Sequence, residues 1–185
     1  KPKELLDLFN SCGINYFSGV ADSTLGSFLS FVDSCQSIKH RRAVNEGLAV
    51  ASAAGYYLAT SERPCIYLQN SGLGNAINAL SSLTDKEVYD IPVVLLVGWR
   101  GEPGVDDEPQ HTRMGKITTS LLELLDFDIV YLASNVAISE CQRDIIESLN
   151  RKKRVAILVS RGIFDEKKQE DDGMPTSDKL TSRQV

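Results

Sequence analysis

A single glutamate at the start of an apolar helical pattern is the residue here that most needs a chemical explanation. Glu46 lies within the alanine-rich run Ala43–Ala59 and directly follows Asn45, a good N-cap residue. The small residues after Glu46 predict a helix that is buried on nearly every side. Because an ionised carboxylate is costly to bury alone, we expect a partner group or a ligand nitrogen beside Glu46.

A second polar group, Asn70-Ser71-Gly72-Leu73-Gly74-Asn75, follows the apolar run 64–69. Glycines before a helix let backbone N–H groups approach a phosphate. The third glycine of a dinucleotide fingerprint is absent, because position 77 is Ile77, and no Gly-Lys-Ser/Thr follows. A tight turn from strand to helix is therefore favoured, although the polar side chains of this turn could orient a polar ring as easily as a phosphate.

The remaining polar candidates lie in two loops. Asp22 and Ser23 follow a short apolar strand, and one of the two is expected to cap the next helix. The long polar loop 99–115 carries Arg100 and His111, and His111 is either an acid, a base or an anion donor, or an ordinary solvated histidine. Its three acids, 106–108, could hold a metal, but an acidic run is more often a solvated face.

Several chemistries are disfavoured. The four cysteines are irregularly spaced, without a CxxC pair, and only two histidines accompany them, so a protein-built metal site is not expected. The apolar setting of Cys12, Cys65 and Cys141 suits reduced core thiols in the cytoplasm. No Gly-x-Ser-x-Gly is present for a serine hydrolase.

Length and composition set the class of the protein. A chain of 185 residues that is 42% hydrophobic can bury one full core. Its net charge of −5 offers no footprint for nucleic acid or for an anionic membrane. Apolar runs such as 91–97 are far shorter than the roughly 20 residues of a membrane span.

Strand-like and helical patterns alternate along the chain, which predicts an α/β fold with a doubly wound, mostly parallel sheet of five or six strands. We expect the basic run 151–154 to be a solvated helix end. The domain is predicted to span residues 1–164, and residues 165–185, rich in charge, Gly, Pro and Ser, are predicted to form a linker or tail. The predicted strands are 14–18, 38–44, 64–69, 91–98, 129–132 and 155–159.

Four separated blocks lie between Leu5 and Arg161, namely Gly19-Val20-Ala21-Asp22-Ser23, Asn45-Glu46-Gly47, Gln69 to Ala76, and Gly98 to Gly104 continuing through Asp107 to His111. In order and spacing these blocks strongly resemble the phosphonopyruvate decarboxylase family, with the α chain of sulfopyruvate decarboxylase as the nearest rival. One departure is Ala21, where the family pattern Gly-Val-Pro-Asp has proline, and this could loosen the loop that directs Asp22.

The resemblance implies a thiamine diphosphate-binding fold, with this chain as the pyrimidine-binding domain of a decarboxylase that converts phosphonopyruvate to phosphonoacetaldehyde and CO₂. In the family, the glutamate at the position of Glu46 hydrogen-bonds the pyrimidine N1′ and so favours loss of the thiazolium C2 proton. The implied cofactor-binding residues are Glu46, Asn70, Ser71, Gly72, Gly74 and Asn75. The implied substrate-binding residues are Asp22, Ser23, Arg100 and His111.

The resemblance also implies a second domain whose Gly-Asp-Gly motif holds Mg²⁺ and the diphosphate, and no Gly-Asp-Gly occurs here. We expect that domain either in a truncated C-terminal part of the same protein, which we favour, or in a separate β subunit. A homo-oligomer, such as a dimer, is expected. The alternatives are a sulfopyruvate decarboxylase subunit and a non-catalytic module that dimerises through its helices.

Overall fold

The computed structural model describes residues 1–133, 138–151 and 154–164. The predicted linker, 165–185, lies outside these residues, as do Lys152 and Lys153 of the basic run and the first two residues of the helix predicted from residue 136.

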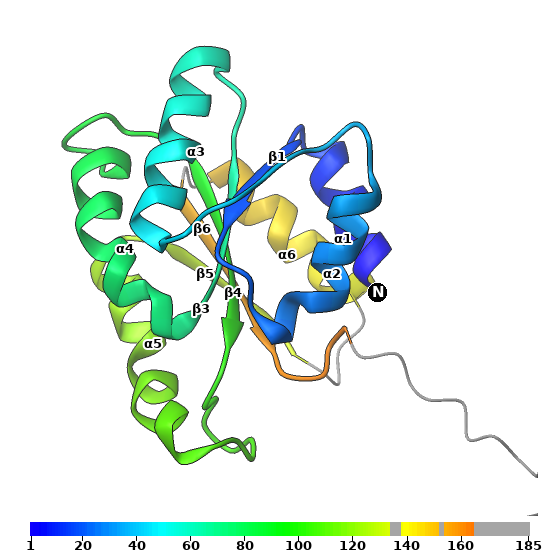
Figure 1. Cartoon of the computed structure of the whole chain (residues 1–185), viewed down its shortest axis with the longest axis vertical. Coiled ribbons are helices and arrows are strands. Elements are labelled where there is room, and N and C mark those ends of the chain that lie inside the picture. The colour runs from blue at the N-terminus through cyan, green and yellow to red at the C-terminus, as the bar shows by residue number, and fades with distance from the viewer. Residues whose placement is uncertain (134–137, 152–153, 165–185) are drawn as a thin grey trace, which may run out of the picture.

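A six-stranded sheet forms the centre of the domain, and every pairing in it is parallel. The strand order is β2-β1-β3-β4-β6-β5, which confirms the predicted doubly wound α/β class (Figure 1). The strands are β1 (Tyr16–Gly19), β2 (Lys39–Arg42), β3 (Cys65–Gln69), β4 (Val93–Trp99), β5 (Asp128–Leu132) and β6 (Arg154–Ser160).

Helices cover both faces of the sheet, as the crossover connections of parallel strands require. Helices α1 (Pro2–Ser11), α2 (Gly26–Ser34) and α6 (Ile138–Arg151) pack on one face. Helices α3 (Glu46–Thr60), α4 (Leu73–Ala79) and α5 (Thr112–Leu124) pack on the other, and Figure 1 shows them to the left of the sheet. The loop predicted at 99–115 is shorter in the structure. A 3₁₀ turn at Pro109–His111 leads into α5, which begins at Thr112.

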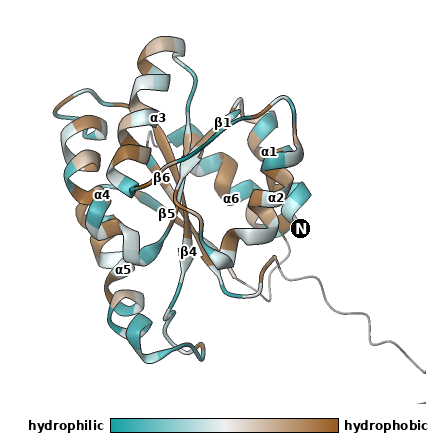
Figure 2. Cartoon of the chain, viewed as in Figure 1, coloured by the Kyte–Doolittle hydropathy of each residue, from teal (hydrophilic) through white to brown (hydrophobic). Residues whose placement is uncertain are grey.

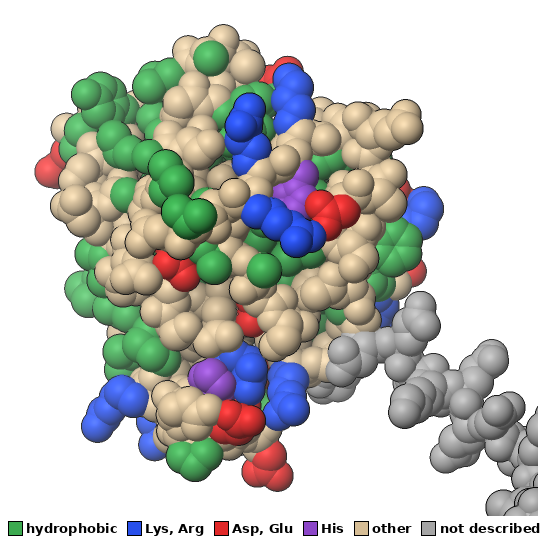
Figure 3. Space-filling model, in the orientation of Figure 1, with side chains coloured by type: hydrophobic (Ala, Val, Ile, Leu, Met, Phe, Trp, Pro, Cys, Tyr) green, Lys and Arg blue, Asp and Glu red, His purple; other side chains and the backbone are tan. Residues whose placement is uncertain are grey.

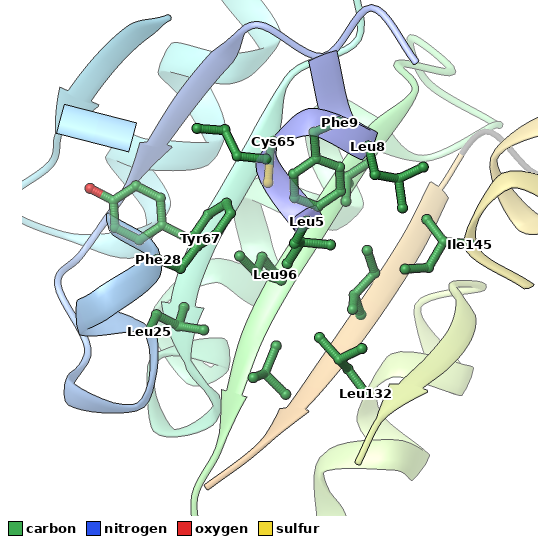
Figure 4. Close-up of a cluster of buried hydrophobic side chains, with 14 of the residues drawn as sticks. Leu5, Leu8, Phe9, Leu25, Phe28, Cys65, Tyr67, Leu96, Leu132 and Ile145 are labelled. Carbon is green, nitrogen blue, oxygen red and sulfur yellow. The ribbon is translucent and has the colours of Figure 1, made fainter. Parts of the chain in front are cut away.

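The two faces of the sheet bury two apolar clusters. Strands β4 and β6 are buried at every position, so they form the apolar centre that Figure 2 shows in brown. In Figure 4, Phe9 of α1 and Phe28 of α2 pack over Cys65 and Tyr67 of β3. All four cysteines are free thiols, and within the described residues no helix is long and apolar enough to cross a membrane.

Helix α3 begins as predicted but is less buried than predicted. The side chain of Asn45 accepts a hydrogen bond from the backbone N–H of Leu48 at 3.1 Å, which confirms the N-cap. Only one side of the helix, which includes Val50 and Ala53, packs on the sheet. Leu48 and Leu58 are 52% and 65% exposed on the outer side, so the prediction of burial on nearly every side is wrong for this chain.

The basic run after α6 was also predicted incorrectly at Arg154, which is 4% exposed instead of solvated. Its guanidinium pairs with Asp85 at 3.0 Å and Asp126 at 3.2 Å, and it lies over the ring of Phe127. The reason is that Arg154 opens β6 instead of ending α6, and its side chain therefore joins the loops at the amino ends of the strands.

Replacing Arg154 with alanine should lower the free energy of unfolding by about 2 kcal/mol or more, because it removes a buried cation together with its packing on Phe127. Arg151→Ala is the matched control: its guanidinium is 57% exposed and pairs with Asp128, so we expect a loss below about 1 kcal/mol. Urea denaturation measures both. Equal losses would show that Arg154 is no more than a surface cation.

Candidate active site at the carboxyl ends of the strands

The predicted site residues come from loops that leave the carboxyl ends of β1, β3 and β4, and from the start of α3. The chain passes from β1 to β2 on one side and then returns to β3 on the other side of β1, so the strand order reverses between β1 and β3. The helices that follow these two strands, α2 and α4, cover opposite faces of the sheet. A reversal of this kind leaves a crevice, which is where open α/β sheets bind ligands.

Glu46 lies in that crevice and is held by the turn that follows β3. The side-chain amide of Asn75 donates a hydrogen bond to Glu46 Oε2 at 2.9 Å. A Cβ added to Gly72 would lie 2.3 Å from Glu46 Oε1, so only glycine permits this approach. Within the described part of the chain, Oε1 receives no hydrogen bond. The carboxylate is thus fixed through one oxygen, while the other stays available to a ligand.

Asn70 is fully buried and has a structural role that the sequence did not reveal. Its amide nitrogen donates to the backbone oxygen of Arg100 at 2.8 Å and to Thr118 Oγ1 at 2.9 Å. Its amide oxygen accepts from the backbone N–H of Arg100 at 3.2 Å. Asn70 therefore ties the ends of β3 and β4 to α5, and both of its amide hydrogens are engaged.

Asp22 does not cap the next helix, contrary to prediction. It and Ser23 make no side-chain capping bond, because a 3₁₀ turn (Ser23–Leu25) precedes α2 and the carboxylate of Asp22 turns inward. Asp22 is 6% exposed, and neither of its carboxylate oxygens has a hydrogen-bond partner. A Cβ on Gly98 would lie 2.0 Å from Asp22 Oδ2, so the carboxylate rests on the end of β4.

Burial shifts the protonation of Asp22. Desolvation raises the pKa of its carboxyl group, because the ionised form loses hydration, and the positive charge of Arg100 only partly opposes this shift. A buried acid without a partner is a common mark of a functional site. The sequence showed Asp22 as a candidate but gave no sign that it would be buried.

Arg100 is anchored by Asp107. Two guanidinium nitrogens of Arg100 donate to the two carboxylate oxygens of Asp107, at 2.7 and 2.6 Å. Asp107 also accepts from the backbone N–H groups of Gly101 and Glu108, and its side chain is only 4% exposed. The prediction of a solvated acidic face therefore fails at Asp107. The hydrogen bonds from Arg100 hold the pKa of Asp107 well below its usual range.

The other predicted residues lie nearby with fewer contacts. Ser71 is exposed and accepts a hydrogen bond from Gln69, and Ser23 is exposed in the turn before α2. Gly74 is exposed at the start of α4, and a Cβ there would meet no described atom within 4 Å. His111 is half-buried, with its backbone against Gly101. No group of three or more metal-ligating side chains occurs among the described residues.

Fold and site together define a parallel α/β domain that places a helix-borne carboxylate and a buried acid where the strand order reverses. Residues 3–120 match the family model described as thiamine pyrophosphate enzyme, N-terminal TPP binding domain. The chain belongs to this family.

Within this family, the chain is similar in sequence to two kinds of decarboxylase. The chain is 41% identical over 116 residues to a phosphonopyruvate decarboxylase of Streptomyces viridochromogenes and 38% identical over 125 residues to that of Streptomyces hygroscopicus. The matches span 63% and 68% of this chain but only 28% and 30% of those proteins. A sulfopyruvate decarboxylase subunit alpha of Methanothermobacter thermautotrophicus is 32% identical over 80% of this chain and 87% of its own length.

Solved structures support the fold. A thiamine diphosphate-dependent 4-hydroxybenzoylformate decarboxylase of Rhodococcus jostii aligns with a TM-score of 0.59 at 19% identity, over 86% of this chain and 29% of its own. Benzoylformate decarboxylase of Polynucleobacter necessarius aligns with a TM-score of 0.62 at 14% identity, over 99% of this chain and 33% of its own.

Gly72→Ala should displace Glu46 while leaving the domain folded. The added Cβ would collide with the flexible end of the Glu46 side chain, so the side chain should rotate away and lose its bond to Asn75, with stability changed by no more than about 1 kcal/mol. Nuclear magnetic resonance of the Asn75 side-chain amide reports the loss. Gly74→Ala is the matched control, because its Cβ has open space. An unshifted Asn75 amide in Gly72→Ala would contradict this geometry.

Asp22→Asn should stabilise the domain in a pH-dependent way. A carboxyl whose pKa is raised in the folded state favours folding below its unfolded pKa and loses that contribution as pH rises through the folded pKa. The variant should therefore gain about 1 kcal/mol near pH 7 and less near pH 4. Urea denaturation at both pH values measures this. Asp144→Asn, at an exposed carboxylate, should change little, and a destabilised Asp22→Asn at neutral pH would contradict the prediction.

Proposed function

We propose that this chain is the pyrimidine-binding half of a thiamine diphosphate-dependent decarboxylase that acts on phosphonopyruvate in phosphonate metabolism. The observation that carries the proposal is the cluster of Glu46, Asn75 and Gly72, in which a carboxylate oxygen is left available beside a backbone without a Cβ. The matched relatives are more than three times as long as the aligned part, so the complete activity is assigned to a larger assembly.

The residues present fit the aminopyrimidine of thiamine diphosphate. Glu46 would hold the ring nitrogen N1′ through Oε1, while Asn75 keeps the carboxylate in place through Oε2. The Asn70–Gly72 turn and Gly74 would lie along the ring edge. When bound, the cofactor supplies the nucleophilic carbon and the electron sink that decarboxylation of a 2-keto acid requires. Glu46 then serves to hold and exchange a proton at N1′.

At the substrate end, we assign Asp22, Ser23, Arg100 and His111 to the keto acid and its phosphonate. The guanidinium of Arg100 suits a phosphonate, although Asp107 already occupies two of its nitrogens, which leaves Nη1 for the substrate. Burial raises the pKa of Asp22 and so disfavours its ionised form, which lessens the repulsion of an anionic substrate. The same group could supply a proton after CO₂ leaves.

A partner domain would cover the exposed side of α3. Val44, Leu48 and Leu58 are 92%, 52% and 65% exposed, and Ile77 of the neighbouring α4 is 36% exposed. Apolar side chains gathered beside a candidate site favour an interface over free solvent. We assign this surface to the diphosphate-binding domain that would carry Mg²⁺, either in the same protein or in a partner subunit, within a homo-oligomer.

One specific observation favours a second candidate. The chain covers 87% of a sulfopyruvate decarboxylase subunit alpha, against about 30% of the phosphonopyruvate decarboxylases. Sulfopyruvate differs from phosphonopyruvate only in its oxyanion, so the same site could serve either. Parallel assays of the two keto acids with the assembled enzyme decide the substrate. Turnover of neither would leave the chain as a non-catalytic binding module and would overturn the proposal.

Glu46→Gln should lower kcat by a factor of about 100 or more in the enzyme assembled with its diphosphate-binding domain, because an amide cannot exchange a proton with N1′. Circular dichroism should show an unchanged fold. Glu62→Gln is the control, since Glu62 lies beyond the other end of α3 and accepts a hydrogen bond from Tyr56. Near-normal turnover in Glu46→Gln would refute the role of Glu46.

A further inference from the structure

The edge strand β2 carries three cationic side chains, Lys39, Arg41 and Arg42. In the described part of the chain, only the face that carries Arg42 and His40 pairs with a carboxylate. Arg42 and His40 both contact Asp33 of α2, with His40 Nδ1 2.7 Å from the carboxylate. Lys39 and Arg41, which alternate with them along the strand, have no carboxylate within ion-pair distance among the described residues. Lys39 lies instead over the ring of Tyr56 at 5.3 Å.

Lys39 and Arg41 line adjoining hollows between β2 and α3. One has a volume of 470 Å³ and is lined by Ser18, Arg41, Arg42, Ala43, Leu48 and Ser52. The other has a volume of 390 Å³ and shares Arg41 and Ser52 with the first. We call the two together the β2–α3 groove. None of the residues lining it is a predicted cofactor- or substrate-binding residue, and only Leu48 is shared with the surface that we assign to the diphosphate-binding domain.

A buried hydroxyl also lines this groove. Ser18 is 1% exposed, and its Oγ has no hydrogen-bond partner. Ser18 is paired in register with Arg41 on the neighbouring strand. Because a buried hydroxyl without a partner costs free energy, its presence beside an unpaired guanidinium indicates a missing acceptor.

Charges on an edge strand also discourage aggregation, which is a simpler explanation for these cations. It would account for exposed cations on either face of β2, but it does not require a buried hydroxyl beneath them. The protein is also acidic overall, with a net charge of −5, so an excess of basic residues does not explain two cations without a carboxylate on one strand. Figure 3 shows Lys and Arg side chains gathered on the upper part of the face, over the light-blue strand that Figure 1 draws between α2 and α3.

We propose that the β2–α3 groove is a second binding site, separate from the decarboxylation site, for a small molecule that carries a phosphate or similar tetrahedral oxyanion. Arg41 supplies charge-assisted hydrogen bonds and Ser18 supplies the buried hydroxyl donor. Lys39 adds a second positive charge, and Tyr16 and Tyr56, whose rings stack at 4.2 Å, form an aromatic wall for the rest of the ligand.

The test uses the chain without thiamine diphosphate, so that its result does not depend on the proposed enzyme activity. Titration with inorganic phosphate at constant ionic strength, followed by nuclear magnetic resonance, should give saturable shifts at the amides of Gly19, Arg41 and Ser52 in the millimolar range. Glycerol 3-phosphate should bind more tightly if the groove accepts an ester. Equal affinity for both would mean that the groove recognises the oxyanion alone and that the aromatic wall contacts no part of the ligand.

Two variants locate the site. Arg41→Gln should weaken phosphate binding about tenfold, and Ser18→Ala about fivefold without loss of stability, since the hydroxyl it removes has no partner in the protein. Arg143→Gln changes the net charge equally, but on the exposed face of α6, and should have no effect.

Three outcomes would overturn the proposal. They are the absence of saturable shifts, binding that Arg41→Gln leaves unchanged, and shifts confined to the loop around Arg100. Self-association that Arg41→Gln abolishes would identify the groove as a protein interface instead of a ligand site. Circular dichroism of each variant shows whether the fold is retained, and Arg41→Lys should recover part of the affinity.

Discussion

The arrangement of the site depends on how closely backbone and carboxylate approach each other at two glycines. Glu46 rests against Gly72, and Asp22 rests against Gly98, with so little space that a methyl group at either glycine would overlap the carboxylate. These contacts place one acid at the start of α3 and the other at the end of β4, on either side of the reversal in strand order. A parallel sheet brings strand ends to a common edge, but only residues without a Cβ let the side chains settle directly on that edge.

Hydrogen bonds between largely buried polar side chains fix the loops around these acids. Asn70 uses both amide hydrogens and its oxygen to join β4 and α5, and Arg100 spends two of its nitrogens on Asp107. Hydrogen bonds of this kind hold a loop in one geometry, since breaking any of them leaves a buried partner unsatisfied. Two acids are exceptions: Asp22 has both carboxylate oxygens unpaired, and Glu102 has one. Rigid surroundings around unsatisfied acids are typical of a site prepared for a ligand.

The sequence predicted the doubly wound sheet because β3, β4 and β6 are continuous apolar runs, a local pattern that reports burial on both faces. It also predicted the N-cap at Asn45, which depends on neighbouring residues only. It could not predict that Asp107 pairs with Arg100, that Arg154 is buried, or that Asp22 turns away from α2. Each of these depends on contacts between segments brought together by the fold, and charge in a sequence gives no indication of which opposite charge will lie beside it.

The wrong prediction for α3 is itself informative. Alanines and glycines along a helix indicate close neighbours on several sides, and in the described structure one side of α3, around Leu48 and Leu58, is largely exposed. Burying an exposed leucine contributes about 1.5 to 3 kcal/mol, so a surface with several of them beside Glu46 would gain free energy from a partner. We infer that the small and apolar residues of α3 suit a helix that is buried on both sides in the assembled enzyme, whereas the apolar strands are already buried within this chain. On this account the helix is organised for two tasks at once: its inner side anchors Glu46 to the domain, and its outer side brings the carboxylate against the domain that completes the site.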